Sequence, residues 1–183
     1  VERVRLVVHD WGAVALAFAQ RHPERVERLV VIDAVPLLPG FRWHRMARVW
    51  RAPLLGELAM GLTLRSTLSR ALRPAFASGR PPAGFAEAAL RHFDQGTQRA
   101  ILRLYRSAPE ASLAAAGRGL SSLSIPALIA WGAHDPYIPA RFGDLYAAEL
   151  PGAGEVVHVG DAGHWPWLDR PDLIDRIATF LDE

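Results

Sequence analysis

Two short apolar runs rich in β-branched residues constrain this chain most, because a helix-forming segment separates them. The runs are residues 4–8 and 28–32, and each has the character of a buried strand. Residues 13–21 between them are rich in alanine, and the His22-Pro23 pair ends the helix they predict, since proline cannot continue a helix. A strand, a helix and a strand within about thirty residues form a βαβ unit, which predicts a parallel sheet.

The strand pattern stops after Pro36, and the following segment predicts only helices and loops. One of these helices, over residues 42–51, would be amphipathic. Its apolar face would be made of Trp43, Met46, Ala47 and Trp50.

The strand pattern returns at residues 126–131 and 155–159, and a helical segment follows each of these runs. The chain is therefore predicted to be an α/β protein with a helical insertion between two parts of its sheet. We assign residues 1–36 and 123–183 to the core and residues 37–122 to the insertion.

The composition of the 183 residues fits a folded protein with a sizeable core, since 50% are hydrophobic and only 22% are charged. There is no cysteine, which excludes disulfides, thiolate nucleophiles and cysteine metal sites. All 21 basic residues are arginine, but the net charge is only +2, so the charge balance does not point to nucleic acid. The apolar runs are too short to span a bilayer and no signal-peptide pattern is present. We therefore expect a cytoplasmic protein that does not bind membranes.

The first candidate for chemistry is Asp10, in the sequence VHDWG at the turn from the first strand into its helix. Such a turn holds its central side chain up at the carboxyl end of the sheet, as in a nucleophile elbow. An aspartate there is already ionised near neutral pH, so it can attack saturated carbon and form an ester. The structural alternative is that Asp10 only caps the helix.

Two further polar turns follow the later strands. Asp135 lies in the sequence WGAHDP after the third predicted strand, and His164 lies in GDAGHW after the fourth. In a parallel sheet all of these turns open on one edge, so we expect Asp10, Asp135 and His164 to meet there. The other histidines are scattered and show no HExxH or HxxEH spacing, so no metal site is predicted.

At this point the sequence resembles the α/β-hydrolase family, and more narrowly its branch with an aspartate nucleophile, the haloalkane dehalogenases and epoxide hydrolases. The resemblance rests on HDWG at 9–12, WGAHDPYIP at 131–139 and DAGHWPWLDRP at 161–171. It implies a parallel-sheet α/β-hydrolase fold of which this chain holds strands five to eight only, with an inserted helical cap. Because the chain starts at Val1 and directly enters a strand, we expect a fragment that is inactive by itself.

The resemblance also implies a role for each site residue. Asp10 would attack the substrate, and His164, oriented by Asp135, would activate the water that hydrolyses the ester. The backbone N–H of Trp11 would be an oxyanion donor, and its indole N–H could face a leaving halide. Asp33, after the second strand, occupies a position where some dehalogenases have their acid, and is the alternative partner of His164.

The substrate class depends on the helical segment. An epoxide needs a donor to its ring oxygen, and Tyr105 resembles one of the lid tyrosines of epoxide hydrolases. Trp43 and Trp50 could line the pocket or bind halide instead, and core packing is the alternative role of all three. We therefore expect an epoxide hydrolase-like enzyme, with a haloalkane dehalogenase as the alternative and a non-catalytic binding domain as the alternative of another class. The expected partners are a small apolar substrate and water, without a cofactor, and the sequence gives no basis for an oligomeric state.

Overall fold

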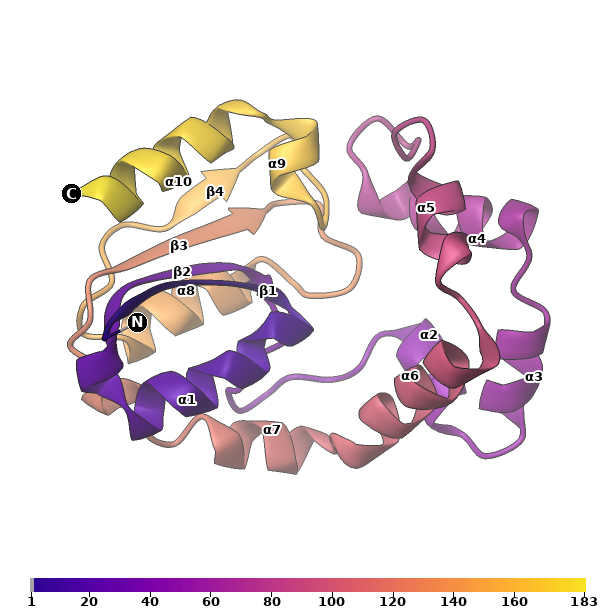
Figure 1. The fold of residues 1–183 in the computed structure, drawn as a ribbon, viewed down its shortest axis with the longest axis horizontal. Coiled ribbons are helices and arrows are strands. Elements are labelled where there is room, and N and C mark those ends of the chain that lie inside the picture. The colour runs from indigo at the N-terminus through magenta and orange to yellow at the C-terminus, as the bar shows by residue number, and fades with distance from the viewer. Residues whose placement is uncertain (1) are drawn as a thin grey trace.

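The computed structural model describes residues 2–183 and contains one parallel sheet of four strands in the order β1-β2-β3-β4 (Figure 1). The strands are β1 (Val4–Asp10), β2 (Val26–Ala34), β3 (Ala127–Gly132) and β4 (Val157–Val159), and every neighbouring pair is parallel. The predicted α/β fold with a parallel sheet is therefore confirmed.

Helices cover both faces of this sheet (Figure 1). Between β1 and β2 the chain forms the 3₁₀ turn η1 (Trp11–Ala15), α1 (Leu16–Arg21) and η2 (Pro23–Arg25). After β3 come α8 (Arg141–Glu149), then β4, and finally α9 (Pro166–Asp169) and α10 (Asp172–Asp182). These connections place α1 and α8 on one face and α10 on the other.

Side-chain alternation along the strands explains this layering. Leu29 and Val31 of β2 belong to the larger core cluster with α1 and α8. Val30 and Ile32 belong to the second cluster, beneath α10. Because β2 lies between two other strands and under two layers of helices, its second half is buried without interruption.

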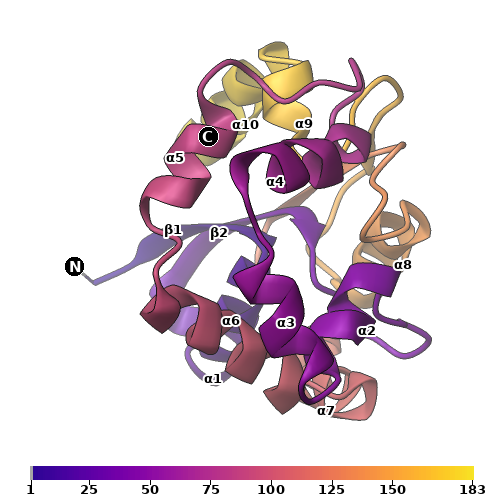
Figure 2. The same cartoon turned by 90° about the vertical axis from the view of Figure 1, so that its right-hand side faces the viewer.

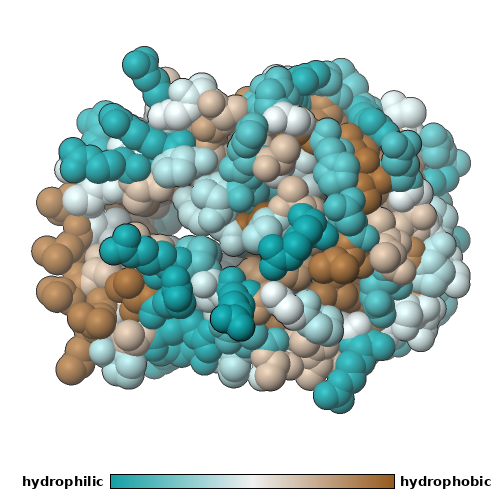
Figure 3. All heavy atoms as spheres, turned by 180° about the vertical axis from the view of Figure 1, so that it is seen from behind, coloured by the Kyte–Doolittle hydropathy of each residue, from teal (hydrophilic) through white to brown (hydrophobic). Residues whose placement is uncertain are grey.

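The helical segment lies beyond the carboxyl ends of the strands (Figures 1 and 2). Its helices are α2 (Arg45–Arg51), α3 (Leu55–Gly61), α4 (Arg65–Leu72), α5 (Phe85–Arg91), α6 (Gln95–Ser107) and α7 (Glu110–Ala116), with short 3₁₀ turns η3 (Arg73–Ala75) and η4 (Leu120–Ser122). Exposed leucines gather on α3 and the residues beside it, at the left edge of Figure 3. None of the helices formed by residues 2–183 is both long enough and apolar enough to cross a membrane.

The predicted helix over residues 42–51 is wrong at its start. The helix begins at Arg45, because the His44 side chain accepts a hydrogen bond from the Ala47 backbone and caps it there. Trp43 precedes the helix and is buried by a contact far along the chain, its indole donating to the Ala108 carbonyl at 2.9 Å. Met46, expected on the apolar face, is 41% exposed.

Gln20 of α1 fixes the end of the helical segment to the core. Its side-chain amide donates to the Ala116 carbonyl at 2.9 Å, and its carbonyl accepts from the Gly119 backbone at 2.8 Å. Gly117 lies so close to Leu37 that a Cβ would come 1.8 Å from the Leu37 carbonyl oxygen. The two chain crossings between sheet and helical segment are thus held together, which fixes the position of the helices over the strand ends.

Candidate active site

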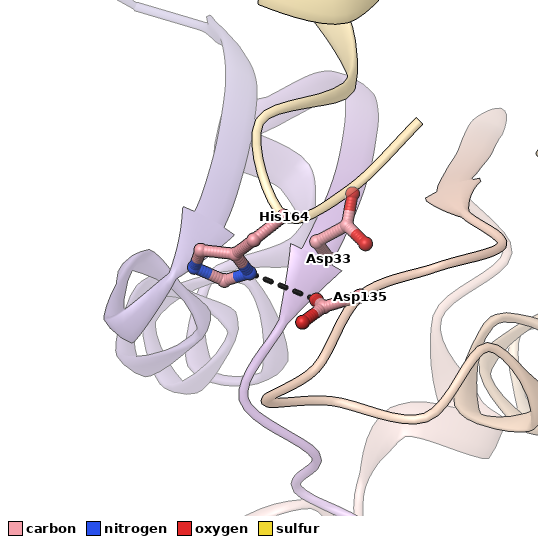
Figure 4. A group of neighbouring side chains, drawn as sticks. All are labelled: Asp33, Asp135 and His164. Carbon is pink, nitrogen blue, oxygen red and sulfur yellow. Dashed lines mark hydrogen bonds and ion pairs between the residues drawn. The ribbon is translucent and has the colours of Figure 1, made fainter. Parts of the chain in front are cut away.

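Four titratable side chains lie at the carboxyl edge of the sheet. Asp10 ends β1, Asp33 is the second-last residue of β2, Asp135 follows β3 and His164 follows β4. Figure 4 shows Asp33, Asp135 and His164 as neighbours from three different segments. The parallel arrangement of the strands brings these distant residues together.

Asp10 has an unusual backbone conformation for an aspartate. Its φ of 48° and ψ of −123° lie outside the strand and helix regions, which costs on the order of 1–3 kcal/mol. The side chain makes no capping hydrogen bond to the helix that follows, so the helix-cap alternative does not account for it. Its side chain remains about one-third exposed, at 36%, and lines a cavity.

The His164 imidazole lies between two carboxylates. Its Nδ1 lies 2.8 Å from Asp135 Oδ2, shown as a dashed line in Figure 4, and its Nε2 lies 3.9 Å from Asp10 Oδ2. Burial lowers the pKa of His164, but its interactions with Asp10 and Asp135 outweigh burial, and the net result is a pKa well above the ordinary value. The ring is thus held as a cation while both carboxylates are charged.

Backbone contacts fix the two loops that carry this pair. Asp135 Oδ1 accepts hydrogen bonds from the backbone N–H groups of Tyr137, at 2.7 Å, and Ile138, at 3.1 Å. The His164 backbone N–H donates to the Ala75 carbonyl at 2.9 Å. The backbone therefore occupies Asp135 Oδ1 and leaves Oδ2 to face Nδ1 of His164.

Asp33 is completely buried and does not form the hydrogen bond to His164. Both of its carboxyl oxygens face the Gly132 backbone N–H, at 3.1 and 3.3 Å. Burial, followed by the negative charge of Asp135, raises the pKa of Asp33 far above that of an ordinary carboxyl group. Of the two acids that the sequence offers, Asp135 is the one within hydrogen-bonding distance of the imidazole.

His9 packs beside this group. Its ring centroid lies 4.7 Å from that of His164, and its Nε2 lies 2.8 Å from the His164 carbonyl oxygen. Burial and the positive charge of His164 lower the pKa of His9, so it is neutral at pH 7. The His9 ring also makes an edge-to-face contact with Trp167, with ring centroids 4.6 Å apart. These contacts are those of a packing residue.

A cavity of about 630 Å³ opens from Asp10 and His164 into the helical segment. Its wall is mainly apolar, and includes Met60, Leu68, Leu72, Phe93 and Ile101. Trp43 and Trp50, which sequence reasoning proposed for the pocket, line it, and so does Tyr105, which was proposed as a donor to the leaving group.

Trp11, the residue after Asp10, packs against two of the aromatic residues that line the cavity. Its ring stacks on Trp43 with centroids 5.2 Å apart, and Tyr105 meets it edge-on at 5.0 Å. The Trp11 indole nitrogen is buried and has no hydrogen-bond partner of normal geometry in residues 2–183. The Trp43 indole N–H donates to the Ala108 carbonyl, whereas the Trp11 indole interacts with the Tyr105 hydroxyl without a hydrogen bond of normal geometry.

A family model described as the alpha/beta hydrolase fold matches residues 1–171. The chain belongs to this family. Its relatives include cis-3-alkyl-4-alkyloxetan-2-one decarboxylase from Shewanella oneidensis, 28% identical over all of this chain, and epoxide hydrolase 2 from Caenorhabditis elegans, 25% identical over all of this chain. The chain spans 61% and 56% of the lengths of these two proteins, respectively.

A solved structure shows the same fold. An ancestral haloalkane dehalogenase superposes on the whole chain with a TM-score of 0.79 at 22% identity, and the chain covers 70% of it. At this identity the likeness establishes the fold of this α/β hydrolase and not its substrate.

Among the cavity-wall residues that sequence reasoning did not single out are two ring side chains close to the site. His44 and Tyr137 both line the cavity, with ring centroids 4.9 Å apart, and Tyr137 also meets the His164 ring edge-on at 5.0 Å. Tyr137 stands within the WGAHDPYIP segment, so its place beside Asp135 could have been noticed. His44 gives no such signal, because its position depends on where α2 begins.

The acid cluster of this α/β hydrolase also has the spacing of a cation site. Asp33, Asp135 and His164 each offer one ligand atom, and these atoms lie within 4.8 Å of one another. Two of the three groups already form a hydrogen bond to each other, so a cation would have to replace that bond. The hydrogen-bond network accounts for the arrangement without a metal ligand set.

Proposed function

We propose that this α/β hydrolase uses Asp10 as a nucleophile toward saturated carbon and hydrolyses the resulting ester with a water activated by His164. The observation that supports it best is the position of the His164 ring, between Asp10 at 3.9 Å and Asp135 at 2.8 Å. A third carboxyl group, Asp33, is excluded from the ring by its contact with Gly132.

In the first step an Asp10 oxygen forms a bond to the substrate carbon, and the bond from that carbon to the leaving atom breaks with its electron pair. In the second step a water oxygen attacks the ester carbonyl, and His164 Nε2 accepts the proton of the water. The alcohol then leaves and the Asp10 carboxylate is regenerated. The Trp11 backbone N–H is the proposed donor to the oxyanion.

The charge of the site supports this order of events. While Asp10 is an anion, the elevated pKa of His164 keeps the ring protonated and unable to act as a base. Once Asp10 is an ester its negative charge is gone, so one of the two interactions that raise the His164 pKa is lost. The imidazolium can then release its proton, to solvent after halide loss or to the phenolate left by epoxide opening, and the neutral ring is ready to accept a proton from water.

An epoxide is the substrate class we favour, because two phenols line the cavity near Asp10. Burial, and then the charge of Asp10, raise the pKa of Tyr105 above its ordinary value. Burial and the charge of Asp135 raise the pKa of Tyr137 to about 12. Both phenols are protonated at neutral pH and can donate to an epoxide oxygen. The 630 Å³ apolar cavity favours an epoxide with a substantial hydrocarbon part.

A haloalkane dehalogenase is the second candidate, and the indole N–H of Trp11, which makes no hydrogen bond of normal geometry within residues 2–183, favours it. A halide leaving group needs such a donor and no proton.

A non-catalytic binding domain, the third alternative, would use the cavity without forming an ester. We also propose a cytoplasmic location, and a reaction with water and an apolar substrate that needs no cofactor. The proposal includes the expectation that residues 1–183 are inactive by themselves.

The test uses the longest natural polypeptide that carries this sequence, incubated with a panel of alkyl and aryl epoxides and haloalkanes. In His164→Gln, ester formation should continue while hydrolysis stops, so a covalent adduct should accumulate and map to Asp10 by peptide mass spectrometry. An epoxide adds its full mass, whereas a haloalkane adds its mass less that of the hydrogen halide, so the increment separates the two classes.

His158→Gln is the matched control, because His158 is an exposed histidine that pairs with Asp144 away from the site. It should turn over normally and accumulate nothing. If His164→Gln gives no adduct with any member of the panel while substrates still bind, the nucleophilic mechanism is refuted and the binding domain is favoured.

A further inference from the structure

Asp33 is a buried acid for which the proposed reaction has no use. It is completely buried, its φ is 38°, and its carboxyl group faces the Gly132 backbone N–H. Figure 4 shows Asp135 as its neighbour. A buried charge without compensation is strongly destabilising, so its protonation state has to follow from its surroundings.

The hydrogen-bond donors around the two acids are unequally shared. Asp135 receives the backbone N–H groups of Tyr137 and Ile138 and the ring N–H of His164, at 2.7, 3.1 and 2.8 Å. Asp33 receives a single backbone N–H, from Gly132, divided between its two oxygens. Negative charge is therefore stabilised on Asp135, and a proton shared by the pair belongs on Asp33.

A protonated Asp33 has one O–H donor, and Asp135 is the acceptor beside it. One carboxyl oxygen of Asp33 lies within 4.8 Å of one carboxyl oxygen of Asp135. A hydrogen bond from a protonated Asp33 to Asp135 would complete a chain that runs from the Gly132 N–H through both acids to His164.

We propose that Asp33 is a positioning residue whose neutral carboxyl group donates a hydrogen bond to Asp135 and so holds that carboxylate against Nδ1 of His164. This inference rests on the proposed function for its catalytic meaning, although the hydrogen-bond chain itself can be tested without a substrate. Once Asp10 is an ester, a neutral Asp33 also leaves Asp135 as the one negative charge of these three acids near His164, whereas a charged Asp33 would help to hold the ring in its protonated form.

Two substitutions separate a neutral donor from a charged acid. Asp33→Asn keeps an acceptor for Gly132 and a donor for Asp135, so it should imitate the protonated acid. We expect hydrolysis of the Asp10 ester to change less than about threefold in Asp33→Asn and to slow about tenfold or more in Asp33→Ala, with ester formation little changed in both. If Asp33 acted as a charged partner of His164, Asp33→Asn would lose hydrolysis as Asp33→Ala does, and the proposal would be overturned.

The pH dependence of unfolding gives a readout that needs no substrate. A group with a raised pKa in the folded state contributes stability that is complete below its unfolded pKa and is lost as the pH rises through the folded pKa. As the pH rises from 5 to 8, the wild type should therefore lose stability relative to Asp33→Asn. The ratio of the wild-type folding equilibrium constant to that of the variant should fall about tenfold per pH unit. Asp161→Asn, a substitution at an exposed aspartate, is the control and should show no such trend. A flat ratio for Asp33→Asn would refute a neutral Asp33, whether or not the protein hydrolyses epoxides.

The wild-type protein provides a further measurement should either variant fail to fold. Carbon-13 NMR of protein labelled at the aspartate carboxyl carbons should show one carboxyl group that remains protonated at pH 7. In ring nitrogen-15 spectra, the Nδ1–H of His164 should be strongly hydrogen-bonded. Titration of every aspartate below pH 5 would overturn the proposal.

Discussion

Tyr146 of α8 holds the segment that follows β2, next to the site, and its hydroxyl can be tested by substitution. Its hydroxyl donates to the Val35 carbonyl at 2.8 Å and accepts from the Leu37 backbone N–H at 2.9 Å. The whole side chain is buried. One phenol therefore satisfies two backbone groups in the segment that leaves β2 for the helices.

Tyr146→Phe removes only the hydroxyl, so the change in packing volume is small. It leaves a buried N–H and a buried C=O without this partner. An unsatisfied buried polar group costs about 1–3 kcal/mol, so we expect the free energy of unfolding to fall by about 2 kcal/mol. For a domain of this size that corresponds to a melting temperature lower by roughly 4–8 °C.

The measurement is urea unfolding followed by circular dichroism, with the melting temperature as a second readout. Tyr137→Phe is the matched control, because the structure gives its hydroxyl no hydrogen bond within residues 2–183, and it should cost less than about 0.5 kcal/mol. A loss in Tyr146→Phe no larger than that of the control would show that the hydroxyl does not hold this segment.

Two further predictions concern the site itself. In Gly163→Ala the new Cβ would come 2.2 Å from the Ala75 carbonyl oxygen. We therefore expect a loss of about 1–3 kcal/mol in unfolding free energy and slower ester hydrolysis. Gly160→Ala is the control and should change neither, because a Cβ there meets nothing within 4 Å. Trp11→Phe keeps an aromatic ring but removes the indole N–H. If haloalkanes are substrates, halide release should fall by about a hundredfold, while epoxide opening should change little. Equal losses of activity on both substrate classes would exclude leaving-group binding by the indole.

The sheet and the meeting of the site residues could be predicted because both follow from local patterns. β-branched runs predict the strands, and parallel strands place the turns after them on one edge. The positions of Asp10, Asp135 and His164 therefore need only the order of elements, not their detailed packing.

The helical segment could be predicted only in character. Trp43 was expected on the face of a helix, but its indole is bound by a carbonyl 65 residues later in the chain. The apolar periodicity of residues 42–51 cannot predict a contact with a residue outside that segment. The pocket that Trp43 lines is formed by pairings between short helices that have no sequence motif.

The choice between Asp33 and Asp135 depends on strand register, which the sequence does not show. In the pairing of β1 with β2, His9 is opposite Ile32 and Asp10 is opposite Ala34, so Asp33 is an additional residue without a partner. Such a bulge interrupts the alternation of side chains and redirects the one it contains. Asp33 is thereby directed to the Gly132 backbone, and the acid that meets His164 is the one in the loop after β3.

The bulge also links the stability of α8 to the geometry of the nucleophile. Asp10 and Asp33 both have positive φ values, 48° and 38°, and such strain persists only where surrounding contacts hold it. Val35, two residues after Asp33, ends the bulge, because its backbone N–H donates to the Asp10 carbonyl at 3.0 Å. The Val35 carbonyl in turn accepts a hydrogen bond from the Tyr146 hydroxyl. Loss of the Tyr146 hydroxyl should therefore relax Asp10 as well as destabilise the fold. In Tyr146→Phe we expect the rate of ester formation to fall along with the unfolding free energy, and an unchanged rate at the lower stability would show that the strain at Asp10 is held by the β1–β2 pairing alone.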